Sequence, residues 1–197
     1  MPKAMLKAGV LACAVAALSG CVLAPQTISL NDSASVAAGT PIVQRDALVR
    51  VVDQRDMGWD VLGHRGGRAP ENSPLLSSEP VRDTLTRRMQ GSLKALGFGE
   101  NSPVEPLRVQ LDIQQFDFAC NEGVIVNECS VNINLMVTVL DGGNTFTKPY
   151  KVFETRSLAA SPVAEYNQKW VNEVLDKLWA HMFSDQELLA ALQVQVP

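Results

Sequence analysis

Two stretches of the chain decide its fold: LRVQLDIQQFDFAC at positions 107–120 and VNINLMVTVL at positions 131–140. Both alternate apolar and polar residues, the pattern of a β-strand that buries one face. In the second stretch the apolar residues are mostly at odd positions, whereas in the first they change from odd to even after Ile113. One extra residue near Gln114 and Gln115 restores the match, so we predict an antiparallel hairpin with a β-bulge there.

This bulged hairpin specifies which residues face each other. The expected pairs are Phe118 with Val131, Phe116 with Ile133, Ile113 with Leu135 and Val109 with Val139. A two-residue turn at Gly142-Gly143 then leads to a third strand, in which Phe146, Tyr150 and Val152 face Val139, Leu135 and Ile133. The result is a three-stranded meander with one continuous apolar face, while Asn, Gln, Asp and Thr side chains make the other face wet.

The same register places Cys120 opposite Cys129. Opposed residues of an antiparallel pair lie within disulfide range, so we predict a disulfide here rather than two reduced thiols. On the chain-entropy estimate, closing so short a loop stabilises the fold by about 2–3 kcal/mol. Redox catalysis is not expected, because eight residues separate the cysteines instead of the two of a C-x-x-C motif.

Two amphipathic helices flank the meander. The first is predicted over Glu79–Leu96, with Ser77 or Ser78 as its cap and Gly97 at its end; its apolar face consists of Val81, Leu85, Met89, Leu93 and Leu96. The second follows Ser161 with Pro162 at N1, and a short terminal helix capped by Ser184 or Asp185 runs to Leu192. With a strand at Ala47–Asp53, the order β-α-β-β-β-α predicts an α+β domain, residues 46–197, with two helices packed on one face of the sheet. Residues 54–78 are expected to form a long loop, partly mobile or functional.

The N-terminus has the features of a targeting signal. Lys3 and Lys7 precede the apolar run AGVLACAVAAL at positions 8–18, as in a secretory signal. Leu18-Ser19-Gly20-Cys21 resembles a bacterial lipobox, which implies a diacylglyceryl group on Cys21, cleavage just before it, and a signal peptide of residues 1–20. A transmembrane anchor over Ala8–Ala24 is disfavoured. As a helix, these seventeen residues would reach about 25 Å, whereas the hydrocarbon core of a membrane is about 30 Å thick. Cleavage elsewhere, which would release a soluble protein, is the other alternative.

Residues 21–45, rich in Ser, Ala, Thr and Pro, are predicted to be a tether between lipid and domain, in which Ile28 and Leu30 could add a short edge strand. Val22 stands where an aspartate often marks retention at the inner membrane, so we expect the outer membrane, facing the periplasm. Without residues 1–20 the chain has 15 basic and 21 acidic residues. This balance argues against a nucleic-acid partner.

No catalytic constellation is apparent. Asp112, Asp117, Glu122 and Glu128 lie in or beside the hairpin and could serve as paired acids and bases, but a solvated face explains them more simply. The loop with His64, Arg65 and Arg68 is a candidate site for a partner or an anion, against the simpler interpretation of a mobile surface loop. No nucleotide, hydrolase or zinc-protease motif is present, and two distant histidines make a zinc centre improbable. We therefore expect neither a metal nor a cofactor.

The mature chain resembles the YajG-type lipoproteins of Gram-negative bacteria. The similarity rests on modest motifs in a shared order: VVDQR at 51–55, FTKPYK at 146–151, VNEVL at 171–175 and FSDQEL at 183–188. It implies an envelope location and this fold, without an enzymatic activity. We therefore expect a non-catalytic interaction module that uses its sheet edge or the 54–78 loop to hold an envelope protein. The alternative is a lipid- or wall-binding carrier, which would need a cavity between helices and sheet or a basic cleft.

Overall fold

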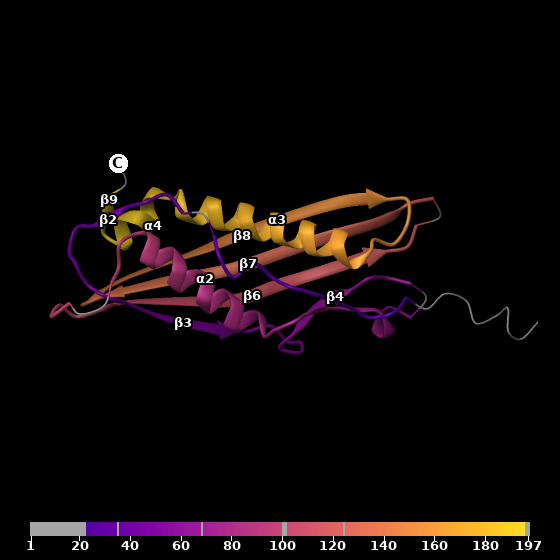
Figure 1. The fold of residues 1–197 in the computed structure, drawn as a ribbon, viewed down its shortest axis with the longest axis horizontal. Helices are drawn as coiled ribbons and strands as arrows, with labels where there is room; N and C mark the ends of the chain where they lie inside the picture. The colour runs from indigo at the N-terminus through magenta and orange to yellow at the C-terminus, as the bar shows by residue number, and fades with distance from the viewer. Residues whose placement is uncertain (1–22, 35, 68, 100–101, 124, 196–197) are drawn as a thin grey trace, which may run out of the picture.

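The meander forms the centre of the fold. In the computed structural model, which describes residues 23–34, 36–67, 69–99, 102–123 and 125–195, it consists of β6 (Leu107–Asn121), β7 (Asn127–Asp141) and β8 (Asn144–Leu158). All four predicted pairs between β6 and β7 are present, and the register shifts between Ile113 and Gln115, where the bulge was expected. Phe146, Tyr150 and Val152 of β8 also face their predicted partners. Figure 1 shows the three long strands running almost the full length of the molecule.

The sheet is larger than the sequence suggested. The mixed α+β class holds, but the sheet has seven strands in the order β1-β5-β4-β6-β7-β8, with β3 (Ala47–Asp53) also paired to β6. The prediction of one long loop over 54–78 is wrong. That segment contains β4 (Val61–His64), a short 3-10 helix (Pro70–Asn72) and β5 (Pro74–Ser77). These strands have only four residues each, too few for a readable alternation.

β3 and β4 share one edge of β6. β3 pairs with its first half, from Leu107 to Ile113, and β4 with Phe118 and Ala119 further along. At Gly63 the backbones approach so closely that a Cβ atom would lie 1.9 Å from the carbonyl oxygen of Phe118, and φ is +132°. Only glycine tolerates this conformation readily, which explains why β4 begins its contact with β6 at this residue.

The helices are α2 (Val81–Ala95), α3 (Ala164–Phe183) and α4 (Gln186–Ala191). The predicted apolar face of α2 is buried, and it joins the apolar side of α3 and the inward residues of β6 and β7 in one core. Gly97 follows α2 with φ +91°, as the cap prediction requires. Asp185 caps α4 as one of the two predicted residues and accepts from the N–H of Glu187, but the predicted N-termini of the two longer helices are wrong. Pro80, without a side-chain cap, precedes α2, and α3 begins two residues after Pro162. Ser77 is instead part of β5.

Within the predicted tether, residues 24–32 are bound to the domain. Gln26–Ile28 form β1, which pairs with β5, so a short edge strand is present at Ile28, but it ends before Leu30. Asn31 is bound from both helices: its carbonyl accepts from Arg88 of α2, and its N–H donates to Asn172 of α3. We call residues 24–32 the N-terminal strap (Figure 1). Further on, β2 (Thr40–Pro41) pairs with β9 (Val194–Gln195). The polar composition of this segment predicted a free tether. The segment is instead held in place because side chains of the helices bind its backbone.

Candidate functional site

One face of the sheet is open. On β8 the alternate residues of this face are exposed at every position from Thr145 to Ser157. Neutral polar groups dominate the neighbouring positions of β7, among them Asn132, Asn134 and Thr138. Large apolar side chains are also exposed on this face: Phe153 of β8 is 64% exposed, Leu48 of β3 55% and Leu140 of β7 40%. The predicted wet face is therefore present, and it also exposes these apolar side chains.

β8 is also an edge strand. It pairs with β7 over all fifteen residues without a register shift, and no other strand of the described residues pairs with its outer side. Pro149 has no N–H, and proline in a sheet sits where that group would face away from the ladder. The backbones of Pro149 and of its odd-numbered neighbours, Thr155 included, therefore point outward. A long exposed edge is a template for another strand.

Sequence reasoning did not single out Phe153 or the edge. The sequence nevertheless contains the signal. Tyr150 and Val152 face the core, and Phe153 directly follows Val152, so it must lie on the opposite face. Pro149 in the middle of a valine- and tyrosine-containing strand also indicates an edge position.

Arg55 fills the space between β3 and β4 along the edge of β6. It makes a bidentate pair with Asp53, at 2.9 and 2.8 Å, and donates to the carbonyls of Val61 at 2.7 Å and Phe116 at 3.3 Å. Its side chain is 1% exposed. These carbonyls lie where the bulge and the strand ends interrupt regular pairing, so the guanidinium replaces missing backbone donors. The VVDQR motif thus has a structural explanation.

Asp117 lies beside this arrangement. Burial raises the pKa of Asp117, and the charges of His64 and Arg55 only partly oppose the effect. At Asp185 burial also disfavours ionisation, but hydrogen bonds from Lys148, Tyr150 and a backbone N–H outweigh it and lower the pKa of Asp185. The two carboxylates therefore influence stability in opposite directions.

We expect Asp117→Asn to raise the free energy of unfolding at pH 7 and Asp185→Asn to lower it. The raised pKa of Asp117 means that its contribution is fully present below the unfolded value and is lost as the pH rises through the folded pKa. The lowered pKa of Asp185 gives stability above the unfolded value that is lost as the pH falls through the folded pKa. Urea unfolding at pH 7 and near pH 3 measures both, and both differences should shrink at the acid end. Equal shifts of the same sign at pH 7 would contradict this assignment.

The described residues of the predicted basic loop are used within the fold. His64 belongs to β4, and its Nδ1 atom is buried without a hydrogen-bond partner. Arg65 is 6% exposed and donates to the carbonyls of Ala24 at 2.6 Å and Pro162 at 3.1 Å. It therefore fastens the strap to the loop before α3. Arg68 lies outside the described residues, as does Cys21.

The other candidate residues do not converge on a site. Asp112 is buried and accepts from Gln110, whereas Glu122 and Glu128 are exposed at the tip of the β6–β7 hairpin. Within the described ranges, no group of three or more His, Cys, Asp or Glu residues could hold a metal ion. Cys120 and Cys129 are joined in a disulfide, with their Cα atoms 4.0 Å apart.

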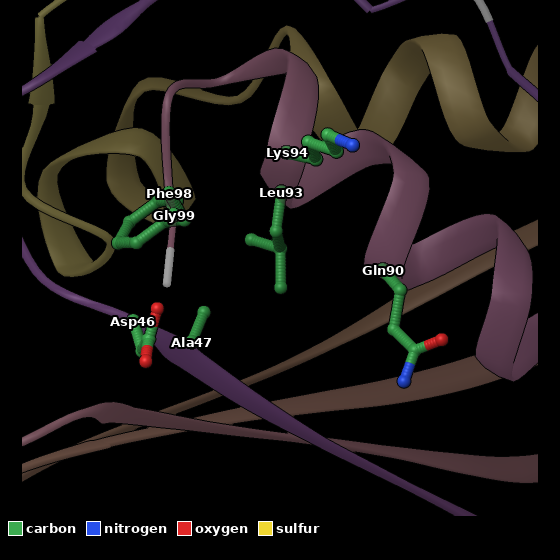
Figure 2. A pocket seen from close by; sticks show the side chains of 7 residues that line it. All are labelled: Asp46, Ala47, Gln90, Leu93, Lys94, Phe98 and Gly99. Atoms are coloured by element: carbon green, nitrogen blue, oxygen red, sulfur yellow. The ribbon is translucent and has the colours of Figure 1, made fainter. Parts of the chain in front are cut away.

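A cavity of about 590 Å³ lies between the C-terminal end of α2 and the start of β3. Figure 2 shows Leu93 pointing toward Ala47, while the amine of Lys94 points away from Asp46. Leu93 and Phe98 are only 2% and 5% exposed, so little apolar surface is available to a lipid. The separated charges do not form an acid–base pair either.

The fold and surfaces define a mixed α+β domain with an open sheet face, and no helix in the described part of the chain is long and apolar enough to span a membrane. A family model, Lipoprotein_16, described as an uncharacterized lipoprotein, matches residues 42–193. The chain belongs to this family, which confirms the YajG-type resemblance and implies association with the cell envelope.

Two solved structures are similar to the chain. The crystal structure of protein XCC0632 from Xanthomonas campestris, of the family DUF330, is 12% identical, with a TM-score of 0.48 over 84% of this chain and 98% of that one. A crystal structure of an uncharacterized protein is 13% identical, with a TM-score of 0.47 over 83% and 95%. A comparison with curated proteins finds no significant match.

Proposed function

We propose that the chain is anchored by lipid at Cys21 and acts as a non-catalytic interaction module of the envelope. Its β8 edge holds an extended segment of an envelope protein. The observation that carries this proposal is the outer side of a fifteen-residue strand, which no strand of the described residues pairs with, next to the exposed Phe153. Addition of a strand to such an edge gives affinity through main-chain hydrogen bonds and specificity through neighbouring side chains.

The anchor is supported by the Leu18-Ser19-Gly20-Cys21 motif and by the lipoprotein family. Two or three acyl chains on one residue hold a protein firmly at a bilayer, whereas one chain binds only marginally. Val22 after the cysteine favours the outer membrane, with the domain in the periplasm. The oxidising periplasm also suits the Cys120–Cys129 disulfide.

The carrier alternative has less support. A lipid carrier needs a roomy apolar cavity, but the largest aromatic side chains of the described core, including Trp170, Trp179 and Phe118, are at most 1% exposed and fill the space between helices and sheet. The cavity at Asp46 presents mainly polar groups. The scattered carboxylates likewise support a non-catalytic role.

Photocrosslinking in cells tests the proposal. A photoreactive residue at Phe153 of the full chain should give one protein adduct, and the same residue at Lys169 of α3, which faces solvent, should give none. Mass spectrometry of the mature N-terminus in the membrane fraction checks the acyl chains on Cys21. An unmodified terminus would contradict the anchor, and no adduct from position 153 would contradict the interaction module.

Thr155→Pro should abolish this adduct while leaving the fold intact. The substitution removes one outward N–H of β8 and no ladder bond, because Thr155 has the orientation of Pro149. Thr155→Ala, which keeps the N–H, is the matched control and should give the adduct at full yield. Circular dichroism and urea unfolding verify that both variants fold. An adduct that survives Thr155→Pro would show that the partner does not pair with the edge.

A further inference from the structure

Three segments of the chain meet at one end of the molecule, where the strap begins. Arg65 ties the carbonyl of Ala24 to that of Pro162, before α3. Asn127, after the tip of the β6–β7 hairpin, donates to Ser161 at 3.3 Å. Leu23 and the carboxylate of Glu122 both lie within 4 Å of the position that a Cβ atom on Gly67 would occupy. We call this end the anchor end; Figure 1 shows it opposite the β7–β8 turn.

The anchor end exposes apolar side chains. Ile125 is 86% exposed, the highest value among the exposed large hydrophobic residues described, and Val126 is 39% exposed. Val163, in the loop before α3, is 61% exposed. That loop, residues 158–163, has no charged residue, whereas the hairpin tip is flanked by Glu122 and Glu128. Apolar side chains exposed next to a polar surface can enter a membrane to headgroup depth.

The position of the strap indicates that the anchor end lies next to the membrane. Cys21 precedes Leu23 by two residues, and two extended residues span at most about 7 Å. Because the strap is bound to the domain from Ala24 onward, almost no free chain separates the lipid attachment site from the anchor end. A long tether would have let the domain rotate away from the membrane, but this connection does not.

We propose that the anchor end is a second membrane contact, in which Ile125, Val126 and Val163 insert shallowly into the bilayer beside the lipidated cysteine. The disulfide at Cys120 and Cys129 holds the base of the tip. β7 rises about 3.4 Å per residue, so its other end lies tens of ångströms from the anchor end and provides a control position remote from the proposed contact. This inference rests on the proposed acylation of Cys21. The following experiment tests the membrane contact and the acylation separately.

Depth-dependent quenching in vesicles tests the contact. The acylated full chain is reconstituted in phosphatidylcholine vesicles with a bimane label at Ile125→Cys, at Val163→Cys or at the control Gly143→Cys in the β7–β8 turn. Lipids brominated near the headgroup end of the acyl chain should remove at least about half of the fluorescence at 125 and 163, because interfacial apolar groups reach that depth. The label at 143 should respond only to aqueous iodide.

A second variant tests whether the tip itself inserts. The double substitution Ile125→Asp and Val126→Asp, with the label at Val163→Cys, should still float with the vesicles, because the acyl chains hold the protein. Its label should lose lipid quenching and become accessible to iodide. Failure to float without these substitutions would refute the acylation. Two results would overturn the membrane contact alone. In the first, the protein floats but its labels at 125 and 143 respond alike. In the second, the label of the double variant is still quenched by brominated lipid.

Discussion

Gly63→Ala should lower the free energy of unfolding by about 3–5 kcal/mol, a range that only severe backbone or packing damage reaches. The new Cβ atom would lie 1.9 Å from the carbonyl oxygen of Phe118, which is backbone of the central strand β6 and cannot rotate away. The φ of +132° adds strain for any residue with a side chain. β4 and β6 would have to separate, which would weaken the attachment of β4 to the rest of the sheet.

Gly91→Ala is the matched control, with an effect of opposite sign. Gly91 lies in α2, is exposed, and has no atom within 4 Å of the Cβ position. Alanine is favoured over glycine in an exposed helix by up to about 1 kcal/mol, so this variant should be more stable than the parent. Urea unfolding of both variants measures the difference. A loss at Gly63 no larger than about 1 kcal/mol would contradict the close approach of β4 and β6.

Trp170→Ala should cost a similar amount, about 3–5 kcal/mol, as for other large aromatic residues removed from a core. Trp170 is 0% exposed and packs edge-to-face on Phe118, with ring centroids 5.9 Å apart. The guanidinium of Arg156 lies 4.8 Å from its ring. The substitution therefore removes contacts that join α3 to both β6 and β8, and the surrounding sheet cannot close over the space.

Trp59→Ala provides the control with the same change of side chain. Trp59 is 61% exposed, and its carbonyl, which accepts from the N–H of Val81 at 3.1 Å, is unaffected. Surface substitutions of this kind change stability by about 0.5 kcal/mol or less. Chemical unfolding monitored by far-ultraviolet circular dichroism compares the two variants without relying on tryptophan emission. Similar losses in both would contradict the central position of Trp170.

The meander could be predicted from sequence because its strands are long and its two faces differ. Fifteen residues of alternation allow the phase change after Ile113 to be recognised as a bulge, and the bulge then fixes the partner of Cys120. Helix α2 was predictable for the same reason, since five apolar residues recur along one stripe. In each case a repeated pattern outweighed the ambiguity of any single residue.

The remaining strands could not be predicted because tertiary contacts define them. β4 depends on the approach permitted at Gly63, and β5 begins with Pro74. β1 is three residues long and is stabilised together with the strap by side chains of α3, such as Gln168, which accepts from the N–H of Ser29 at 2.9 Å. A local sequence pattern cannot indicate a hydrogen-bond partner that is so distant in the sequence. Arg65 likewise belonged to a plausible anion loop in sequence, whereas the fold occupies its guanidinium with two backbone carbonyls.

The N-terminal strap imposes an order on the biogenesis of the protein. Ser29 binds a side chain 139 positions later, and Asn31 binds one 141 positions later, so the earliest part of the mature chain finds its partners only when α3 has been made. Contacts of such long range form late, because the intervening chain must first be organised. With the proposed acylation of Cys21, the strap would therefore reach the bilayer before its binding site between the helices exists, and attachment to the membrane would precede completion of the native state.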